Sequence, residues 1–129
     1  MPVIRTADAT VYELHDTTFT SYAHPSTGST ELCGWRVEVG PGSAGVAHQV
    51  SHEEVFLLLS GTGTAVLDGT PHPMAAGDVL VVPVGVSFRL DTGDTPLTAW
   101  VTTRVGLRAT MADGTEIAPP WASPVLAGS

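Results

Sequence analysis

Two imidazoles and the carboxylate of Glu54 lie on alternate positions of one short segment, Gly45-Val-Ala-His48-Gln-Val50-Ser-His52-Glu-Glu54. Alternate residues of an extended chain share a face, so the even-numbered positions from 48 to 54 can all point the same way. Imidazole nitrogens and carboxylate oxygens bind transition metals, and the same groups transfer protons in general acid–base catalysis. The segment therefore predicts either a metal site or a proton-transfer site.

Glu54 is followed at once by an apolar run, Val55-Phe-Leu-Leu-Leu59, which is hydrophobic on both faces of an extended chain. Burying a carboxylate in such surroundings is costly unless it meets a donor, a cation or a metal. Desolvation raises the pKa of a buried carboxyl group, and a nearby protonated histidine lowers it. We therefore predict that His48 and Glu54 form a catalytic acid–base couple, with His52 as a third candidate. The alternative is a structural hydrogen bond between His48 and Glu54.

The same three residues, His48, His52 and Glu54, also match a second kind of site. Two histidines and one carboxylate make up the ligand set of many non-haem iron centres. We keep this metal site as an alternative, with a divalent transition metal such as iron, manganese, nickel or zinc. The main expectation is that no cofactor is bound.

Composition limits the class of protein. The chain has 129 residues, the size of one domain, and only 14% are charged, against roughly 25% in an average soluble domain. Its net charge is −8 and it has no lysine, which argues against a nucleic-acid partner and excludes Schiff-base chemistry on a lysine amine. The absence of both lysine and asparagine is typical of a GC-rich bacterial genome.

No run of residues approaches the ~18 apolar positions that a membrane span requires. The first residues, Met-Pro-Val-Ile-Arg-Thr, lack the apolar centre of a signal peptide. We expect a cytoplasmic protein without a membrane partner.

Short runs rich in valine, threonine, leucine and aromatic residues alternate with glycine and proline turns, which predicts an all-β chain. Asp68-Gly69 is a typical two-residue hairpin turn. The expected strands are 11–14, 18–23, 32–39, 47–50, 55–60, 64–67, 70–74, 78–82, 87–90 and 97–103. About ten short strands suit a sandwich or a small barrel.

Two spaced motifs resemble those of the cupin family. The first runs Gly, five residues, His-x-His, three or four residues, Glu, six residues, Gly; Gly42, His48, Glu54 and Gly61 occupy its positions here. The second begins Gly, five residues, Pro-x-Gly, and is matched by the segment from Gly77 to Gly85. The resemblance covers roughly residues 32–103.

The resemblance implies a double-stranded β-helix, or jelly-roll, barrel that often forms a homodimer. We expect one domain over 1–129, with its core barrel at about 32–103, N-terminal strands within 1–31 and an extended C-terminal tail over 104–129. The tail carries Trp121, which we expect either to clamp onto the body or a second subunit, or to lie in a disordered end.

The chain departs from the family at two metal-ligand positions. Cupins that bind metal usually supply two histidines and a glutamate from the first motif and a histidine from the second. Here Val50 replaces one histidine and Phe88 replaces another, so only His48 and Glu54 remain. This resemblance implies the fold and a degraded metal site.

Strand alternation predicts an apolar small-molecule pocket with one polar corner at His48 and Glu54. Its expected lining is Trp35, Val37, Val50, Phe56, Phe88 and Trp100. His15 is expected on the surface.

Three functions stay open. The first is a metal-independent enzyme, such as an isomerase, cyclase, dehydratase or lyase, in which Glu54 or His48 moves a proton on a small, largely apolar carbonyl compound. The second is a non-catalytic module that binds or senses a small molecule. The third is a metal-dependent oxygenase or isomerase that uses His48, His52 and Glu54. Fold alone does not choose between them.

Overall fold

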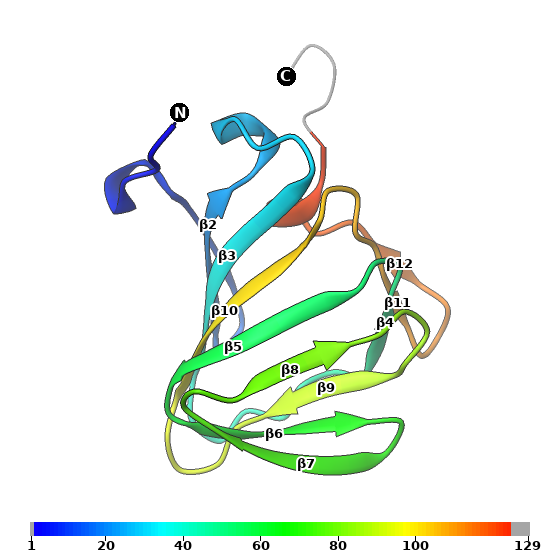
Figure 1. Ribbon diagram of the computed structural model, residues 1–129. Helices are drawn as coiled ribbons and strands as arrows, with labels where there is room; N and C mark the ends of the chain where they lie inside the picture. The colour runs from blue at the N-terminus through cyan, green and yellow to red at the C-terminus, as the bar shows by residue number, and fades with distance from the viewer. Residues whose placement is uncertain (1, 125–129) are drawn as a thin grey trace.

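The computed structural model describes residues 2–124, and within that range twelve strands form two six-stranded sheets (Figure 1). All neighbouring strands are antiparallel. The first sheet has the order β1 (Thr10–Leu14), β2 (Thr17–Ala23), β3 (Leu32–Val39), β10 (Leu97–Arg104), β5 (Glu54–Ser60) and β8 (Val79–Val82). The second has the order β12 (Glu116–Ile117), β11 (Ala109–Met111), β4 (His48–Val50), β9 (Phe88–Asp91), β6 (Thr62–Leu67) and β7 (Thr70–Ala75). The predicted all-β double-stranded β-helix is confirmed.

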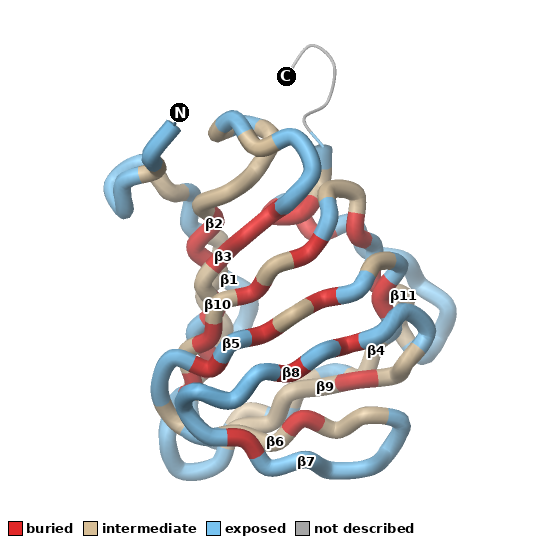
Figure 2. Tube along the Cα trace, viewed as in Figure 1, coloured by how far each residue is buried: buried red, intermediate tan, exposed pale blue. Residues whose placement is uncertain are grey.

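Strand alternation builds the core between the sheets, as the red segments along the strands in Figure 2 show. On β10, residues at odd positions from 97 to 103 are buried, while those between them are half-buried. The same period of two places Trp35, Val37 and Val39 of β3 inside. Each of the ten predicted strands is present, with ends within two residues of the predicted ones.

Two glycine positions show why the turns form where they do. Asp68 and Gly69 both have positive φ, 47° and 81°, as a two-residue hairpin turn between β6 and β7 requires. Gly61, at the end of the first motif, has a φ of 80°, and a methyl group there would overlap the carbonyl oxygen of Pro96. This glycine lets the chain turn directly from β5 into β6.

The core extends beyond the predicted limits of 32–103. Strands β1 and β2 continue the first sheet beside β3, and β11 and β12 continue the second sheet beside β4. The short strands β11 and β12 were not predicted, because they lie in a segment that the sequence indicates only as extended. The one-turn helix η3 (Pro120–Ala122) adds Trp121 and Ala122 to the core. Trp121 therefore clamps onto the body, and residues 125–129 lie outside the described part of the chain.

The remaining helical segments are single turns, η1 (Thr6–Asp8) and η2 (Pro25–Thr27). Among residues 2–124 no helix has the length and apolar character needed to cross a membrane.

Candidate functional site

A cavity of about 820 Å³ opens between the two sheets. Its walls come from β3 and β5 of the first sheet, from β4, β9 and β11 of the second, and from the hairpin of β1 and β2. Pro119 and the first two residues of η3, Pro120 and Trp121, complete the wall. A volume of this size is in the range that holds drug-sized small molecules.

Glu54 is the buried acid of this cavity. It opens β5 and shares the inward face of that strand with Phe56 and Leu58, as its position in the alternation predicts. Only 5% of Glu54 is exposed, and within residues 2–124 no side chain forms an ion pair or hydrogen bond with its carboxyl group. Burial raises the pKa of Glu54 from 4.5 to about 8. The carboxyl group is therefore mostly protonated at neutral pH and has a proton to donate into the cavity.

His48 lines the same cavity, but it does not pair with Glu54. Its Nδ1 lies 2.8 Å from the carbonyl oxygen of Val46, so Nδ1–H donates and Nε2 carries the free lone pair when the ring is neutral. The ring also packs against Phe88, with centroids 4.4 Å apart. The direct hydrogen bond between His48 and Glu54, which was the structural alternative, is not formed in this structure, and both residues line the cavity.

His52 lies outside the cavity lining, contrary to the prediction that it joins His48 and Glu54. The prediction assumed one continuous extended segment. Instead the chain bends over 51–53, as it crosses from β4 in the second sheet to β5 in the first, so the alternation restarts. The Nδ1 of His52 hydrogen-bonds the Ser51 hydroxyl at 2.9 Å.

The four positions that hold metal ligands in the family motifs do converge on the cavity: 48, 50, 54 and 88 all line it. Two of them are the buried apolar residues Val50 and Phe88. Within the described chain no cluster of three or more histidine, cysteine or acidic residues could hold a metal ion. The donor set of His48 and Glu54 is thus short of the three or four protein ligands that tight sites use, and these residues do not fit a metal.

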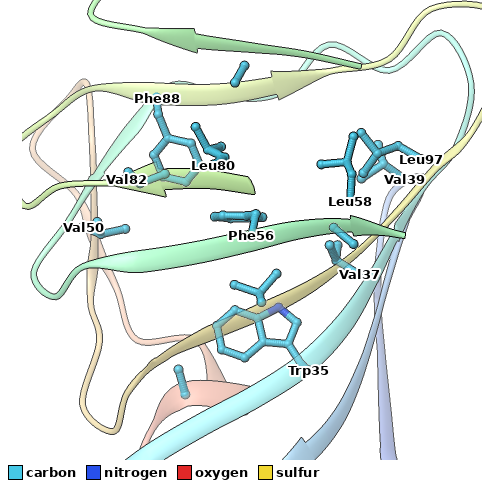
Figure 3. Packing of buried hydrophobic residues seen from close by; sticks show 14 of the residues in the cluster. Trp35, Val37, Val39, Val50, Phe56, Leu58, Leu80, Val82, Phe88 and Leu97 are labelled. Atoms are coloured by element: carbon cyan, nitrogen blue, oxygen red, sulfur yellow. The ribbon is translucent and has the colours of Figure 1, made fainter. Parts of the chain in front are cut away.

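Aromatic side chains dominate the cavity walls. Figure 3 shows Phe56 on β5 and Phe88 on β9 turned toward each other; their ring centroids are 5.8 Å apart in an edge-to-face arrangement. Trp35 and Val37 enter from β3, and Val50 enters from β4. Five of the six predicted lining residues are therefore found there: Trp35, Val37, Val50, Phe56 and Phe88.

Trp100 is the exception, because it lies on the opposite face of its strand and outside the cavity lining. Its neighbours Ala99 and Val101 are both fully buried, so the indole must project to the outer face. There it covers Gly34, where an added Cβ would lie 2.6 Å from the indole. The missing side chain at position 34 makes room for the ring, and Tyr22 packs beside it with centroids 5.8 Å apart.

The sequence did not identify the aromatic wall contributed by the two ends of the chain. Tyr12 and Phe19 of the first hairpin and Trp121 of the last turn all line the cavity. His15, expected on the surface, lies at the hairpin turn and lines the mouth. Alternation within 10–23 indicated two faces for each strand, but no sequence signal indicated that one face closes a cavity.

Comparison with known proteins places this geometry in a family. The model of the family described as "Cupin_2: Cupin domain" matches residues 35–102. A curated relative, a 5-aminosalicylate 1,2-dioxygenase from a Comamonas species, is 42% identical over 43 residues. That match covers 33% of this chain and 12% of the relative, so the chain spans only a small part of that protein.

Solved structures share the fold at low sequence identity. The polyketide cyclase RemF from Streptomyces resistomycificus superimposes with a TM-score of 0.73 and 18% identity over 81% of this chain and 79% of its own. A sugar phosphate isomerase from Silicibacter pomeroyi superimposes with a TM-score of 0.63 and 19% identity, over 92% of this chain and 90% of the isomerase. A salicylate 1,2-dioxygenase from Pseudaminobacter salicylatoxidans superimposes with a TM-score of 0.70 and 18% identity, over 82% of this chain and 33% of the dioxygenase. With two motifs, two sheets and a matched family model in agreement, this chain belongs to the cupin family.

Proposed function

We propose that this protein is an enzyme that moves a proton on a small, largely apolar carbonyl compound, with Glu54 as its catalytic residue and without a metal. The reaction type is that of an isomerase, a cyclase or a lyase. The observation that carries the proposal is the position of Glu54: the residue is only 5% exposed, it lines a largely apolar cavity, and its carboxyl group forms no side-chain hydrogen bond or ion pair within the described chain. A carboxyl group in such a place is free to hydrogen-bond a ligand that enters the cavity.

The chemistry follows from the protonation of that group. A protonated Glu54 donates its proton to the carbonyl oxygen of a ligand, and the carboxylate so formed takes a proton from the adjacent carbon. The carbon–hydrogen bond breaks, its electron pair forms the carbon–carbon double bond of the enol, and Glu54 is protonated again. The free Nε2 of His48 is available to accept a hydrogen bond from a ligand hydroxyl group. One general acid–base residue typically contributes a factor of about 10² to 10⁴ in rate.

The solved neighbours include enzymes of different reaction types, so they do not decide between the candidate functions. They include a polyketide cyclase, a sugar phosphate isomerase and a salicylate dioxygenase, all under 25% identical to this chain. The departures at Val50 and Phe88 support a reaction that needs no metal ligand from those positions.

The test is deuterium exchange into 2-tetralone, a small apolar ketone with acidic protons beside its carbonyl group. Proton NMR in D2O measures the exchange rate with and without protein. We expect the wild-type chain to accelerate exchange and Glu54→Gln to lose at least 100-fold of that acceleration. The control is Glu53→Gln, which makes the same change at the exposed neighbour and should retain the rate. Equal rates in Glu54→Gln and wild type would refute the role of Glu54.

A non-catalytic binding module is the second candidate, and one observation favours it. His48 and Glu54 form no direct hydrogen bond or ion pair, so no proton relay joins them, and the largely apolar lining can hold a ligand without reacting with it. In that case the apolar walls supply the binding energy, 2-tetralone binds without exchange, and binding survives the combined variant with Glu54→Gln and His48→Ala.

We also propose that the protein is a homodimer in which a second copy covers the outer face of the first sheet. Outward-facing residues of β5 and β8 are apolar and exposed there: Leu57 by 38%, Leu59 by 48%, Val79 by 58% and Val81 by 48%. The neighbouring outward positions of β10 are Thr98, Trp100 and Thr102, so this patch carries no charge. In a chain of net charge −8, it is a face on which two copies can meet without repulsion.

A further inference from the structure

The ionisable groups that line the cavity include three carboxyl groups and two imidazoles. Glu13 and Asp16 stand at its mouth on the first hairpin, and Glu54 lies inside. The only groups in the lining that can become cationic are the imidazoles of His15 and His48. Neither an arginine nor a lysine lines it within the described chain, and the sequence has no lysine at all.

The five arginines of the chain are directed elsewhere. Arg36 pairs with Glu38 at 3.1 Å on the outer face of β3, and Arg89 pairs with Asp91 at the same distance. The other three, at positions 5, 104 and 108, are exposed. No guanidinium group is therefore in place to receive an anionic ligand, although arginine is the usual partner of carboxylates and phosphates.

Six of the eight aromatic residues of the chain surround this one cavity: Tyr12, Phe19, Trp35, Phe56, Phe88 and Trp121. They form two clusters. Trp121 lies with Tyr12, Phe19 and Trp35 at ring-centroid distances of 3.9 to 6.4 Å, and Phe56 packs against Phe88. Flat aromatic walls favour flat ligands, because offset-stacked and edge-to-face contacts add to the free energy of apolar burial.

We infer that the ligand of this cavity is an uncharged, planar, fused-ring carbonyl compound, and that the cavity rejects carboxylates and phosphates. This inference rests on the proposed function, in that the same cavity and Glu54 receive the ligand. An ionised group would lose its water here without gaining a guanidinium or ammonium partner, and the lining includes the carboxylates of Glu13 and Asp16. A neutral carbonyl group loses far less hydration free energy on entering the same cavity.

The experiment compares two ligands that differ in one charge: 1,8-dihydroxyanthraquinone and its 3-carboxylate, each titrated by calorimetry at pH 7. Tryptophan fluorescence gives a second readout, since Trp35 and Trp121 line the cavity. We expect the neutral quinone to bind at least tenfold more tightly than the carboxylate. Glu13→Arg supplies the missing cation, so it should tighten binding of the carboxylate at least fivefold more than it changes binding of the neutral quinone. Glu31→Arg makes the same change in charge at an exposed site outside the lining and should change neither value.

Carboxylate binding as tight as that of the neutral quinone, in the wild-type chain, would overturn the inference and leave the proton-transfer proposal standing. Failure of both quinones to bind would overturn the fused-ring assignment, while exchange into 2-tetralone still tests the role of Glu54 by itself. Conversely, a tenfold preference for the neutral quinone together with no exchange would support the inferred ligand class and count against catalysis.

Discussion

The indole of Trp121 stacks on the ring of Phe19, with centroids 3.9 Å apart and planes 11° apart. Phe19 belongs to the first hairpin of the chain and Trp121 to its last described turn. Tyr12 and Trp35 lie at 5.6 and 6.4 Å from the same indole. This aromatic cluster joins the two ends of the chain to the barrel and forms one wall of the cavity.

We predict that Trp121→Ala weakens both folding and ligand binding. Loss of a buried aromatic side chain costs roughly 3 kcal/mol of unfolding free energy, and it opens the cavity wall. Urea denaturation measures the first effect, and titration with 1,8-dihydroxyanthraquinone measures the second. Trp100→Ala is the matched control, because this indole packs on the outer face: it should cost stability but leave affinity within twofold. Unchanged affinity in Trp121→Ala would show that the tail forms no part of the site.

Glu54 should make the stability of the protein fall as pH rises. Burial raises the pKa of Glu54 from 4.5 to about 8 in the folded state. Below pH 4.5 the group is protonated in both folded and unfolded chains, so it carries no penalty there. Between pH 4.5 and 8 the unfolded chain ionises and the folded chain does not, so stability is lost progressively, by roughly 5 kcal/mol at most.

Glu54→Gln should therefore stabilise the chain above pH 5, by an amount that grows until about pH 8 and then levels off. Urea denaturation at a series of pH values measures the difference from wild type. Glu53→Gln, at the exposed neighbouring position, should give a difference that does not change over this range. A pH-independent effect of Glu54→Gln would mean that the carboxyl group ionises normally.

Restoring the two missing histidines should create a metal site. His48 and Val50 are two positions apart on β4, so both side chains face the cavity, and Phe88 of β9 is paired with His48. With the double variant Val50→His/Phe88→His, three histidines and Glu54 line the cavity, which makes up the four ligands of the family pattern. We expect its Zn²⁺ affinity to exceed that of the wild type at least tenfold by calorimetry, at some cost in stability because two buried apolar residues are lost. Equal Zn²⁺ affinities of the variant and the wild type would mean that side chains at positions 48, 50, 54 and 88 cannot coordinate one metal ion together.

Gly61→Ala should destabilise the fold strongly. Its φ of 80° disfavours any side chain, and the added methyl group would overlap the carbonyl oxygen of Pro96. Gly69→Ala is the matched control, since its φ of 81° carries the same strain but nothing lies within 4 Å. We expect about 1 kcal/mol for Gly69→Ala and several times that for Gly61→Ala in chemical denaturation. Equal losses would show that the Pro96 contact relaxes freely.

Charging the outer face of the first sheet should separate the proposed dimer. Leu57→Asp/Val81→Asp puts two carboxylates into the apolar patch, where two copies would repel each other. Light scattering coupled to size-exclusion chromatography should show a dimer for the wild type and a monomer for this variant. Val84→Asp, at an exposed apolar residue away from the strands, should remain a dimer. A monomeric wild type would refute the proposal.

The sequence predicted the strands and the inward position of Glu54 because both depend on short-range rules, whereas the jelly-roll barrel was predicted from the resemblance to the cupin motifs. Asp68-Gly69 determines its own turn, and the parity of Glu54 with Phe56 and Leu58 follows from the pleat of a single strand. The prediction for His52 was wrong because it extended that parity across the change of sheet between β4 and β5.

Trp100 shows a different limit of sequence analysis. Leu97, Ala99, Trp100 and Val101 make an apolar run whose faces cannot be told apart by hydrophobicity. The indole projects outward because Gly34, on the neighbouring strand, leaves space there. Such a long-range fit depends on strand register, as does the contact of Trp121 with the first hairpin, so local patterns do not contain it.

The place of β4 has a consequence for how this protein folds. This strand has three residues, is joined to β9 by the single pair of His48 with Phe88, and meets β11 along its full length. His48 thus gains its second strand neighbour only when β11 docks. Until then one edge of the second sheet stays unpaired and the apolar cavity beside it is open to water, so β4 is the edge at which a partly folded chain can pair with another copy.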